Sequence, residues 1–141
     1  MSRRKRGSGD AVPSAPELSE LQLAVMRVLW TRGEATVADV HAALLAERGL
    51  APTTIATTLQ RLEKRGVVDH FTQGRQFIYR PRVGEADVRR SMVGALTERL
   101  FEGDPAELVN HLLEERDIEP EELERLRRRI ERRRRSEGRE P

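Results

Sequence analysis

The sequence has no cysteine among its 141 residues. This absence excludes disulfides, thiolate metal sites, cysteine nucleophiles and thiol redox sensing. No apolar run approaches the roughly 18–20 residues that span a bilayer, and no hydrophobic segment follows the basic residues at the start of the chain to form a signal peptide. We therefore expect a cytoplasmic protein that does not interact with a membrane.

Aromatic residues are also scarce, at 4% of the chain, so a core has to be built mainly from leucine, valine and alanine. The 37% of hydrophobic residues are enough for this, and they exclude a wholly disordered chain. A length of 141 residues fits one domain, or a small domain with an appendage, and excludes a large multidomain enzyme. The segment 83–120 is net acidic whereas 17–82 and 121–141 are net basic, which indicates a boundary near residue 83.

The sequence also contains no recognisable catalytic motif. The three histidines, His41, His70 and His111, stand far apart in the sequence, and there is no H-E-x-x-H, G-x-S-x-G or Walker phosphate loop. A single helical histidine is more often structural or solvated than a metal ligand. We expect neither an enzyme nor a metal site nor a cofactor.

What the sequence does contain, after a flexible basic tail at 1–16, is a series of helix signals. Ser19 with Gln22, and Thr36 with Asp39, are capping-box pairs that predict helices over about 19–31 and from residue 36 to near 49. Pro52 suits the first turn of a third helix over about 52–65.

The pattern then changes to β-branched and aromatic residues around Gly74, which predicts a short hairpin over 67–79. Three helices followed by a hairpin, with a short connection between the second and third helices, is the order of a winged helix-turn-helix. We therefore predict this DNA-binding domain over 17–82.

The third helix has two distinct faces at about 100° per residue. Ile55, Leu59 and Leu62 define the buried side, and Glu63 points sideways, so the outward half carries no acid. Threonine, glutamine, arginine and lysine can read base edges or hold phosphates. The predicted DNA-binding residues are Thr53, Thr54, Thr57, Gln60, Arg61 and Lys64 on this helix and Arg75 on the hairpin loop. The alternatives are threonines merely tolerated on an exposed helix and an ordinary exposed turn.

Three further helices are predicted, beginning near Glu85, at Asp104–Pro105 and at Pro120, and residues 136–141 are expected to be disordered. Their apolar residues exceed what so few residues bury internally, so we expect 83–135 to be an all-helical dimerisation region. The predicted dimerisation residues are Val88, Met92, Val93, Leu96, Leu100, Leu108, Leu112, Leu123, Leu126 and Ile130. The alternative is that these helices pack back on the winged domain of the same chain.

These segments resemble a known family. The runs LSELQLAVMRVLW, TTIATTLQRLEKRGVV and FIYRP, and then LFEGDPAELVNHLLEERDIEPEELERLRRRI, are similar to the penicillinase-repressor (BlaI/MecI-type) family of bacterial winged-helix repressors, over about residues 17–130. The resemblance implies a homodimer that binds an operator with dyad symmetry, with the C-terminal helices as its interface.

Two departures from the family limit what the resemblance implies. Antibiotic-responsive members have an Asn-Phe cleavage site for a sensor protease, and this chain has His111–Leu112 at the matching place. Copper-responsive relatives carry C-terminal cysteines, and this chain has none. A sensor protease as partner therefore stays open, and thiolate copper sensing is excluded.

The sequence thus predicts a mainly α protein with a small β-hairpin wing that represses transcription as a DNA-binding homodimer. The competing prediction is a protein-interaction module that keeps the winged fold without reading DNA. Whether the RRKR of the tail contacts DNA or only keeps the chain in solution is open.

Overall fold

A computed structural model describes residues 17–115 and 117–138. The basic tail predicted at 1–16 and the last three residues lie outside these ranges. Contacts divide the chain into two compact units, one ending at Leu96 and the other beginning at Thr97. This division lies later than the boundary expected near residue 83, because Val83 and Val88 are buried in the core of the first unit.

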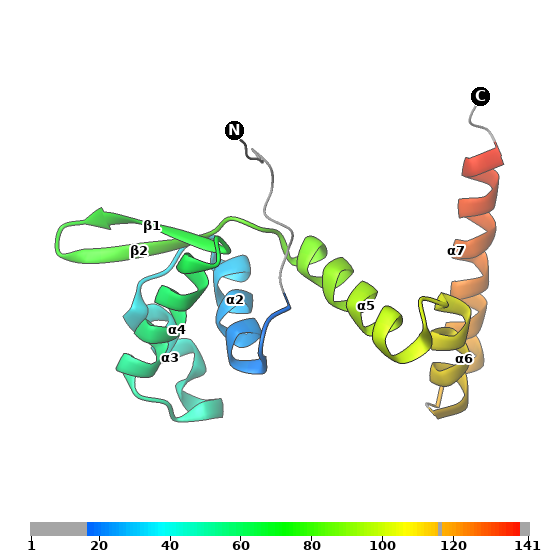
Figure 1. Ribbon diagram of the computed structural model, residues 1–141, viewed down its shortest axis with the longest axis horizontal. Helices are drawn as coiled ribbons and strands as arrows, with labels where there is room; N and C mark the ends of the chain where they lie inside the picture. The colour runs from blue at the N-terminus through cyan, green and yellow to red at the C-terminus, as the bar shows by residue number, and fades with distance from the viewer. Residues whose placement is uncertain (1–16, 116, 139–141) are drawn as a thin grey trace. The chain divides into compact units, whose positions relative to one another are not determined.

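The first unit consists of three helices, α2 (Glu20–Arg32), α3 (Val37–Arg48) and α4 (Pro52–Lys64), followed by an antiparallel hairpin (Figure 1). The start of α5 (Glu85–Phe101) completes it. The predicted fold class, mainly helical with a two-stranded wing, is confirmed.

The first two helices begin where the capping boxes predicted. The Ser19 hydroxyl accepts a hydrogen bond from the Gln22 N–H at 3.2 Å, and the Gln22 side chain accepts one from the Ser19 N–H at 3.0 Å. Thr36 and Asp39 make the same reciprocal pair, at 3.0 Å in both directions. Each box satisfies two backbone N–H groups that have no partner inside the helix, so the start of each helix is fixed locally.

The hairpin pairs β1 (Val68–Gln73) with β2 (Gln76–Pro81). Gly74 has φ +63° at the first position of the two-residue loop, where a type II′ turn requires glycine. A bridge that the sequence did not reveal ties the hairpin to the helices: the Ala35 N–H donates to the Tyr79 carbonyl at 3.0 Å, and the Tyr79 N–H donates to the Ala35 carbonyl at 2.8 Å. The wing is therefore anchored directly to the α2–α3 connection.

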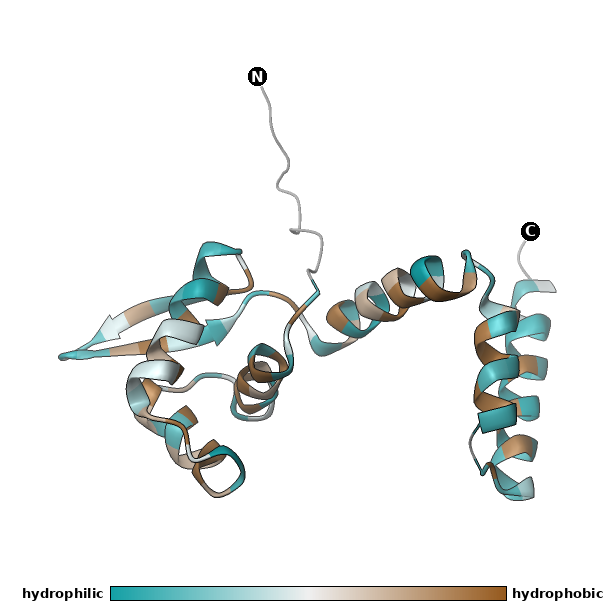
Figure 2. Cartoon of the chain, turned by 60° about the horizontal axis from the view of Figure 1, so that its bottom comes forward, coloured by the Kyte–Doolittle hydropathy of each residue, from teal (hydrophilic) through white to brown (hydrophobic). Residues whose placement is uncertain are grey.

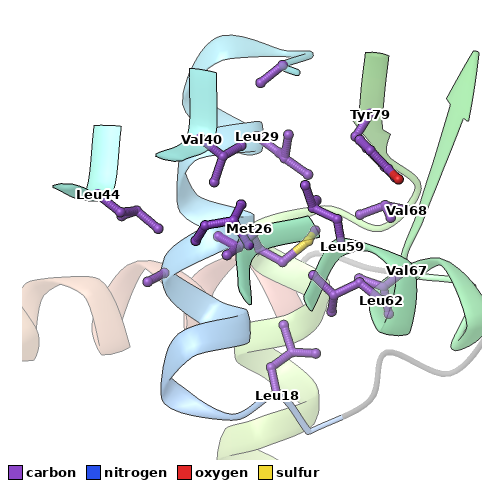
Figure 3. Packing of buried hydrophobic residues seen from close by; sticks show 14 of the residues in the cluster. Leu18, Met26, Leu29, Val40, Leu44, Leu59, Leu62, Val67, Val68 and Tyr79 are labelled. Atoms are coloured by element: carbon purple, nitrogen blue, oxygen red, sulfur yellow. The ribbon is translucent and has the colours of Figure 1, made fainter. Parts of the chain in front are cut away.

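One hydrophobic core holds the first unit together (Figure 3). It contains the predicted stripes of all three helices together with residues of the hairpin. Its largest fully buried side chains are Tyr79, Met26, Leu29, Ile55, Leu59, Leu62, Val25, Val40, Val67, Val68 and Val88. At the edge of this core the Trp30 Nε1 donates to the carbonyl of Val83 at 2.9 Å, which satisfies the indole and holds the segment that leads into α5.

The second unit contains the end of α5 and two further helices, α6 (Pro105–Glu115) and α7 (Pro120–Gly138). Neither α6 nor α7 has a buried residue in the described part of the chain. Figure 2 shows apolar residues interspersed with hydrophilic ones along both helices. The last helix extends to Gly138, beyond the end expected near residue 135, because an ion pair between Arg133 and Glu137 at 3.1 Å supports its final turn.

No helix in the described ranges is both long enough and apolar enough to cross a membrane.

Candidate nucleic-acid interface

The helix α4 presents one apolar and one polar face, as its sequence predicts. Ile55, Leu59 and Leu62 are fully buried in the core. The six residues predicted to face outward, Thr53, Thr54, Thr57, Gln60, Arg61 and Lys64, are all exposed. Packing of the apolar face thus presents a continuous row of hydrogen-bond donors and acceptors to solvent.

The fourth threonine of the helix, Thr58, has a structural role. It is buried, and its hydroxyl donates to the carbonyl of Thr54 at 2.8 Å, which satisfies the polar group within its own helix. The threonine-rich composition of the segment therefore reflects two environments, and only the three exposed threonines are available to a ligand.

The N-terminus of α4 differs from those of α2 and α3. No side chain caps it: its N-cap residue is Ala51, and Pro52 occupies the first turn. Uncapped N–H groups at the positive end of a helix dipole are suited to hold a phosphate. An acid in the first turn would compete for this place, and none is present.

The single acid of α4 is turned away from the polar face and held there. Glu63 is half-buried, and both of its carboxylate oxygens lie 2.8 Å from the Nδ1 of His70 on β1. The His70 ring in turn stacks on Phe77 of β2, with 4.2 Å between ring centroids. This cluster joins α4 to the wing and keeps the negative charge of Glu63 away from the outward face. The charged side chains on that face are therefore Arg61 and Lys64, and both are positive.

Tyr79 belongs to the same cluster, with its ring centroid 5.4 Å from that of His70 and 6.4 Å from that of Phe77. Burial raises the pKa of the Tyr79 hydroxyl, and the charge of Glu63 raises it further. Tyr79 therefore stays neutral at physiological pH and adds no negative charge beside the polar face of α4.

The remaining cations near α4 and the wing are largely occupied within the domain. Arg65 donates to the Glu17 carbonyl at 2.8 Å and to the Gln22 side chain at 3.1 Å, so it fastens the end of α4 to the start of α2. Arg80 lies 3.7 Å from Asp69 and over the ring of Phe71. Arg75, at the exposed loop of the hairpin, has no ion-pair partner in the part of the chain that the structure describes.

Sequence reasoning missed the Glu63–His70 pair, the anchoring role of Arg65 and the Ala35–Tyr79 bridge. The partners of Arg65, which follows the last residue of α4, lie more than 40 residues away in the sequence, so no local pattern indicates them. The pairing of Glu63 with His70 depends on the angle between α4 and β1, which no sequence spacing specifies.

The residues predicted for dimerisation fall into three groups by their burial. Val88 is buried in the core of the first unit, and Met92 packs against that core, so neither is free to form a surface. Leu108 is half-buried. The other seven are exposed large apolar residues: Val93, Leu96, Leu100, Leu112, Leu123, Leu126 and Ile130.

The described residues contain no group of three side chains that could hold a metal ion. His111 and Leu112, at the place of the family's cleavage site, are both exposed on α6, and the His111 ring lies 5.7 Å from that of Phe101.

The polar face of α4 with the wing is the strongest candidate for a functional site, because it is exposed and free of acid. Such a face is suited to a polyanion whose bases present hydrogen-bonding groups at their edges.

The sequence of the chain is similar to known bacterial repressors. The family model described as "Penicillinase repressor" matches residues 18–132. The chain is 31% identical to the penicillinase repressor of Bacillus licheniformis over 111 residues, which cover 79% of this chain and 87% of that protein. It is 39% identical to the transcriptional regulator BlaI of Mycobacterium tuberculosis over 113 residues, which cover 79% and 80% of the two chains.

Among solved structures, the chain is similar to the monomeric form of the Bacillus licheniformis BlaI in complex with the blaP half-operator. The identity is 36% and the TM-score 0.46, over 52% of this chain and 89% of that one.

Proposed function

Because the chain belongs to the penicillinase repressor family and is a DNA-binding transcriptional repressor, we propose that it acts as a homodimer on an operator with dyad symmetry. The observation that carries the proposal is the outward face of α4, which is fully exposed, rich in hydrogen-bonding groups and free of acid. An α-helix with such a face fits the major groove, where every base pair presents a distinct pattern of donors and acceptors.

The proposed contacts divide into those that read bases and those that position the domain. Thr53, Thr57, Gln60 and Arg61 face the base edges: threonine meets thymine methyls or polar edges, glutamine pairs with adenine, and arginine pairs with guanine. Phosphates are held by Lys64, by Arg75 on the wing and by the uncapped N-terminus of α4, with Thr54 beside it. Phosphate contacts fix the register, and base contacts give the sequence preference.

The exposed apolar residues of the second unit support the dimer. Leu100 is 69% exposed and Ile130 60%, and the other large apolar residues of α6 and α7 apart from the half-buried Leu108 are at least 41% exposed. Large apolar side chains are rarely left in water in such number, and a second copy covers the same residues on both chains in a symmetric interface. Two α4 helices about 34–36 Å apart then meet successive major grooves of a dyad-symmetric site.

Repression follows from occupancy: a dimer bound at a promoter operator blocks the polymerase, and its loss or release switches the gene on. Since its ligand is DNA, we place the protein in the bacterial cytoplasm. His111 and Leu112, at the place of the family's Asn-Phe cleavage site, are both exposed on α6. Their residue types differ from Asn-Phe. We therefore propose that release from DNA does not depend on cleavage by a sensor protease at this bond.

Selection of bound duplexes from a random DNA pool tests this proposal. We expect a repeated half-site in inverted orientation, with centres spaced by one helical turn or a multiple of it. With about 6–10 phosphates neutralised per dimer, affinity should fall by roughly 10³–10⁵ between 50 and 200 mM salt. A pool that stays random, or an affinity that does not change with salt, would contradict the proposal.

The variants Thr57→Ala and Gln60→Ala test the assignment of base contacts. Each should weaken binding to the selected operator by about 1–3 kcal/mol and leave binding to random duplex unchanged, because a base contact adds only to specific affinity. Lys64→Gln is the matched control on the same face: it should weaken both duplexes alike and reduce the salt slope by about 1. Unchanged operator preference in both alanine variants would instead favour a winged fold used for protein interaction.

A further inference from the structure

The helix α7 contains a dense cluster of positive charge that repression through α4 does not use. Eight of the eleven residues from 125 to 135 are arginine. All eight are exposed, and the helix has no buried residue. Its apolar residues, Leu123, Leu126 and Ile130, are the ones proposed for the dimer interface.

Acidic neighbours neutralise only some of these arginines. Arg127 lies 2.8 Å from Glu124 and 3.9 Å from Glu131. Arg128 shares Glu124 at 3.4 Å, and Arg133 pairs with Glu137 at 3.1 Å. The hydrogen bond from Arg127 holds the pKa of Glu124 below its ordinary value, so this acid stays charged and remains committed to its partners.

The other five arginines have neither an ion pair nor a hydrogen-bond partner within residues 17–115 and 117–138. Four of them, Arg125, Arg129, Arg132 and Arg135, are named the arginine row below; the fifth is Arg134. The row lines one shallow hollow on the surface of α7, together with Arg127, Arg128 and Glu131, and Arg134 lies outside it. At about 100° per residue the members of the row fall within one third of the helix circumference, and the row is centred on the side away from Leu123, Leu126 and Ile130. Covering the apolar side with a second copy therefore leaves the row accessible.

This arrangement carries an electrostatic cost in the free protein. Arg125 and Arg129 are four residues apart, and Arg129, Arg132 and Arg135 follow at intervals of three, so neighbouring guanidinium groups of like charge repel along the row. The same helix balances Arg127 and Arg133 with acids. Glu131 lines the same hollow as the row, but it is paired with Arg127 at 3.9 Å and forms no ion pair with an arginine of the row. A row of phosphates would relieve this repulsion, and arginine is the side chain best suited to bind them.

We propose that the arginine row binds the phosphate backbone of duplex DNA that flanks the operator. The proposal rests on the proposed function, because binding of α4 to its site brings neighbouring duplex to a high effective concentration around the rest of the same chain. The row spans about 15 Å, along which duplex DNA carries roughly one charge per 1.7 Å. The contact is independent of sequence, because it involves phosphates and no base edges.

Other polyanions fit α7 less well. Proteins that bind single-stranded nucleic acid stack bases on aromatic side chains, and helices that bind a lipid surface use Trp or Phe as anchors. The segment from Pro120 to Gly138 contains no aromatic residue. A helix with charge and no stacking surface is suited to a regular, rod-like array of phosphates such as duplex DNA provides.

The test compares two double variants of the full chain that lose the same charge from the same helix. Arg129→Gln with Arg132→Gln removes half of the row, whereas Arg133→Gln with Arg134→Gln removes two neighbouring arginines outside the hollow. Affinity is measured across a range of salt for the selected operator alone and for the same operator extended by about one helical turn, roughly 10 base pairs, of random sequence on each side. Circular dichroism and thermal melting verify that both variants keep their helices.

On the extended duplex, we expect the row variant to lower the slope of log affinity against log salt by about 1.8 per chain, since each lost phosphate contact removes roughly 0.9. The control variant should lower it much less, and neither variant should change affinity for the operator without flanks. Equal effects of the two variants, or no gain from the flanks in the unmodified protein, would overturn the proposal. So would a row variant that loses binding to single-stranded RNA or to vesicles of anionic lipid while binding the extended duplex normally.

These outcomes are distinct from a failure of the proposed function. If the chain does not prefer the selected operator to random duplex, operator binding through α4 is wrong. If that preference persists and only the effect of the flanks is missing, the arginine row alone is disproved.

Discussion

The two units of this protein bury their apolar residues very differently. In the first, the stripes of α2, α3 and α4 meet in one core whose largest members are fully buried, and reciprocal capping boxes fix the starts of α2 and α3. In the second, α6 and α7 bury no residue, and side chains such as Leu126 and Ile130 stay exposed. The same kind of amphipathic pattern thus produces a core in one place and an unfilled surface in the other. The first unit is stabilised by its own core within one chain, whereas in the second the apolar residues of α6 and α7 stay exposed and are the surface that the proposed dimer would cover.

The largest difference between the two units is expected when one leucine in each is replaced by alanine and the free energy of unfolding is measured. Leu59→Ala removes a fully buried side chain from the first unit and should lower the free energy of unfolding by about 2–5 kcal/mol. Leu113→Ala, at an exposed position on α6, should lower it by less than about 1 kcal/mol at a protein concentration low enough to keep the chain monomeric. Urea titration followed by circular dichroism measures both. Equal losses would show that the second unit has its own core.

A charge placed on the apolar surface of the second unit tests dependence on a partner. Ile130→Glu should weaken self-association at least about tenfold, because a carboxylate in an apolar interface loses its hydration without gaining a partner. The melting of the first unit should stay unchanged. Sedimentation equilibrium measures the association constant. Leu45→Glu is the control, since Leu45 is an exposed leucine on α3, outside the proposed interface; if both substitutions act alike, the assignment of the interface to α7 is wrong.

The capping boxes of the first unit allow a smaller effect to be predicted. Thr36→Ala removes the hydroxyl that accepts from the Asp39 N–H, and we expect a loss of about 0.5–2 kcal/mol in the free energy of unfolding. Thr31→Ala, at an exposed position in α2, should change it by less than about 0.5 kcal/mol. Thermal melts of the two variants side by side measure the difference. If Thr36→Ala left the free energy of unfolding unchanged, packing alone would determine where α3 begins.

The smallest expected effect is one of pH. The backbone hydrogen bond from Thr36, then its side chain and the charge of Arg32, hold the pKa of Asp39 below its ordinary value. A carboxylate whose pKa is lower in the folded state stabilises that state at neutral pH, and this stabilisation is lost as the pH falls through the folded-state pKa. Asp39→Asn should therefore lower the melting temperature slightly at neutral pH, and the difference from the unmodified protein should shrink in acid.

Glu124 on α7 provides the contrast in the second unit. Its pKa is also lowered, first by the side-chain hydrogen bond from Arg127 and then by the charge of Arg127, and this pair is exposed to solvent and therefore screened by salt. The fall in melting temperature caused by Asp39→Asn should persist in high salt, whereas the fall caused by Glu124→Gln should vanish. If salt removed both effects equally, charge rather than the hydrogen bonds of the capping box would account for the stabilisation by Asp39.

By itself, the sequence determined most features that depend on neighbours close along the chain, although it did not show that the Arg133–Glu137 pair extends α7. Capping pairs, Pro52 and Gly74 set the helix starts and the hairpin turn, because a cap or a turn involves atoms only a few residues apart. The period of Ile55, Leu59 and Leu62 determined which side of α4 faces solvent, since burying one stripe exposes the opposite one. That exposed face is most of the candidate site.

Only the tertiary structure decided what depends on distant segments. It assigned Val88 to the core of the first unit rather than to a dimer surface, because the apolar stripe of α5 is the same whether its own chain or another covers it. It paired Glu63 with His70 and fastened Arg65 to Gln22, since these contacts depend on how separate elements cross. The arginine row also emerged only when partners could be assigned, because the sequence gives the charges of α7 but not which of them are already neutralised.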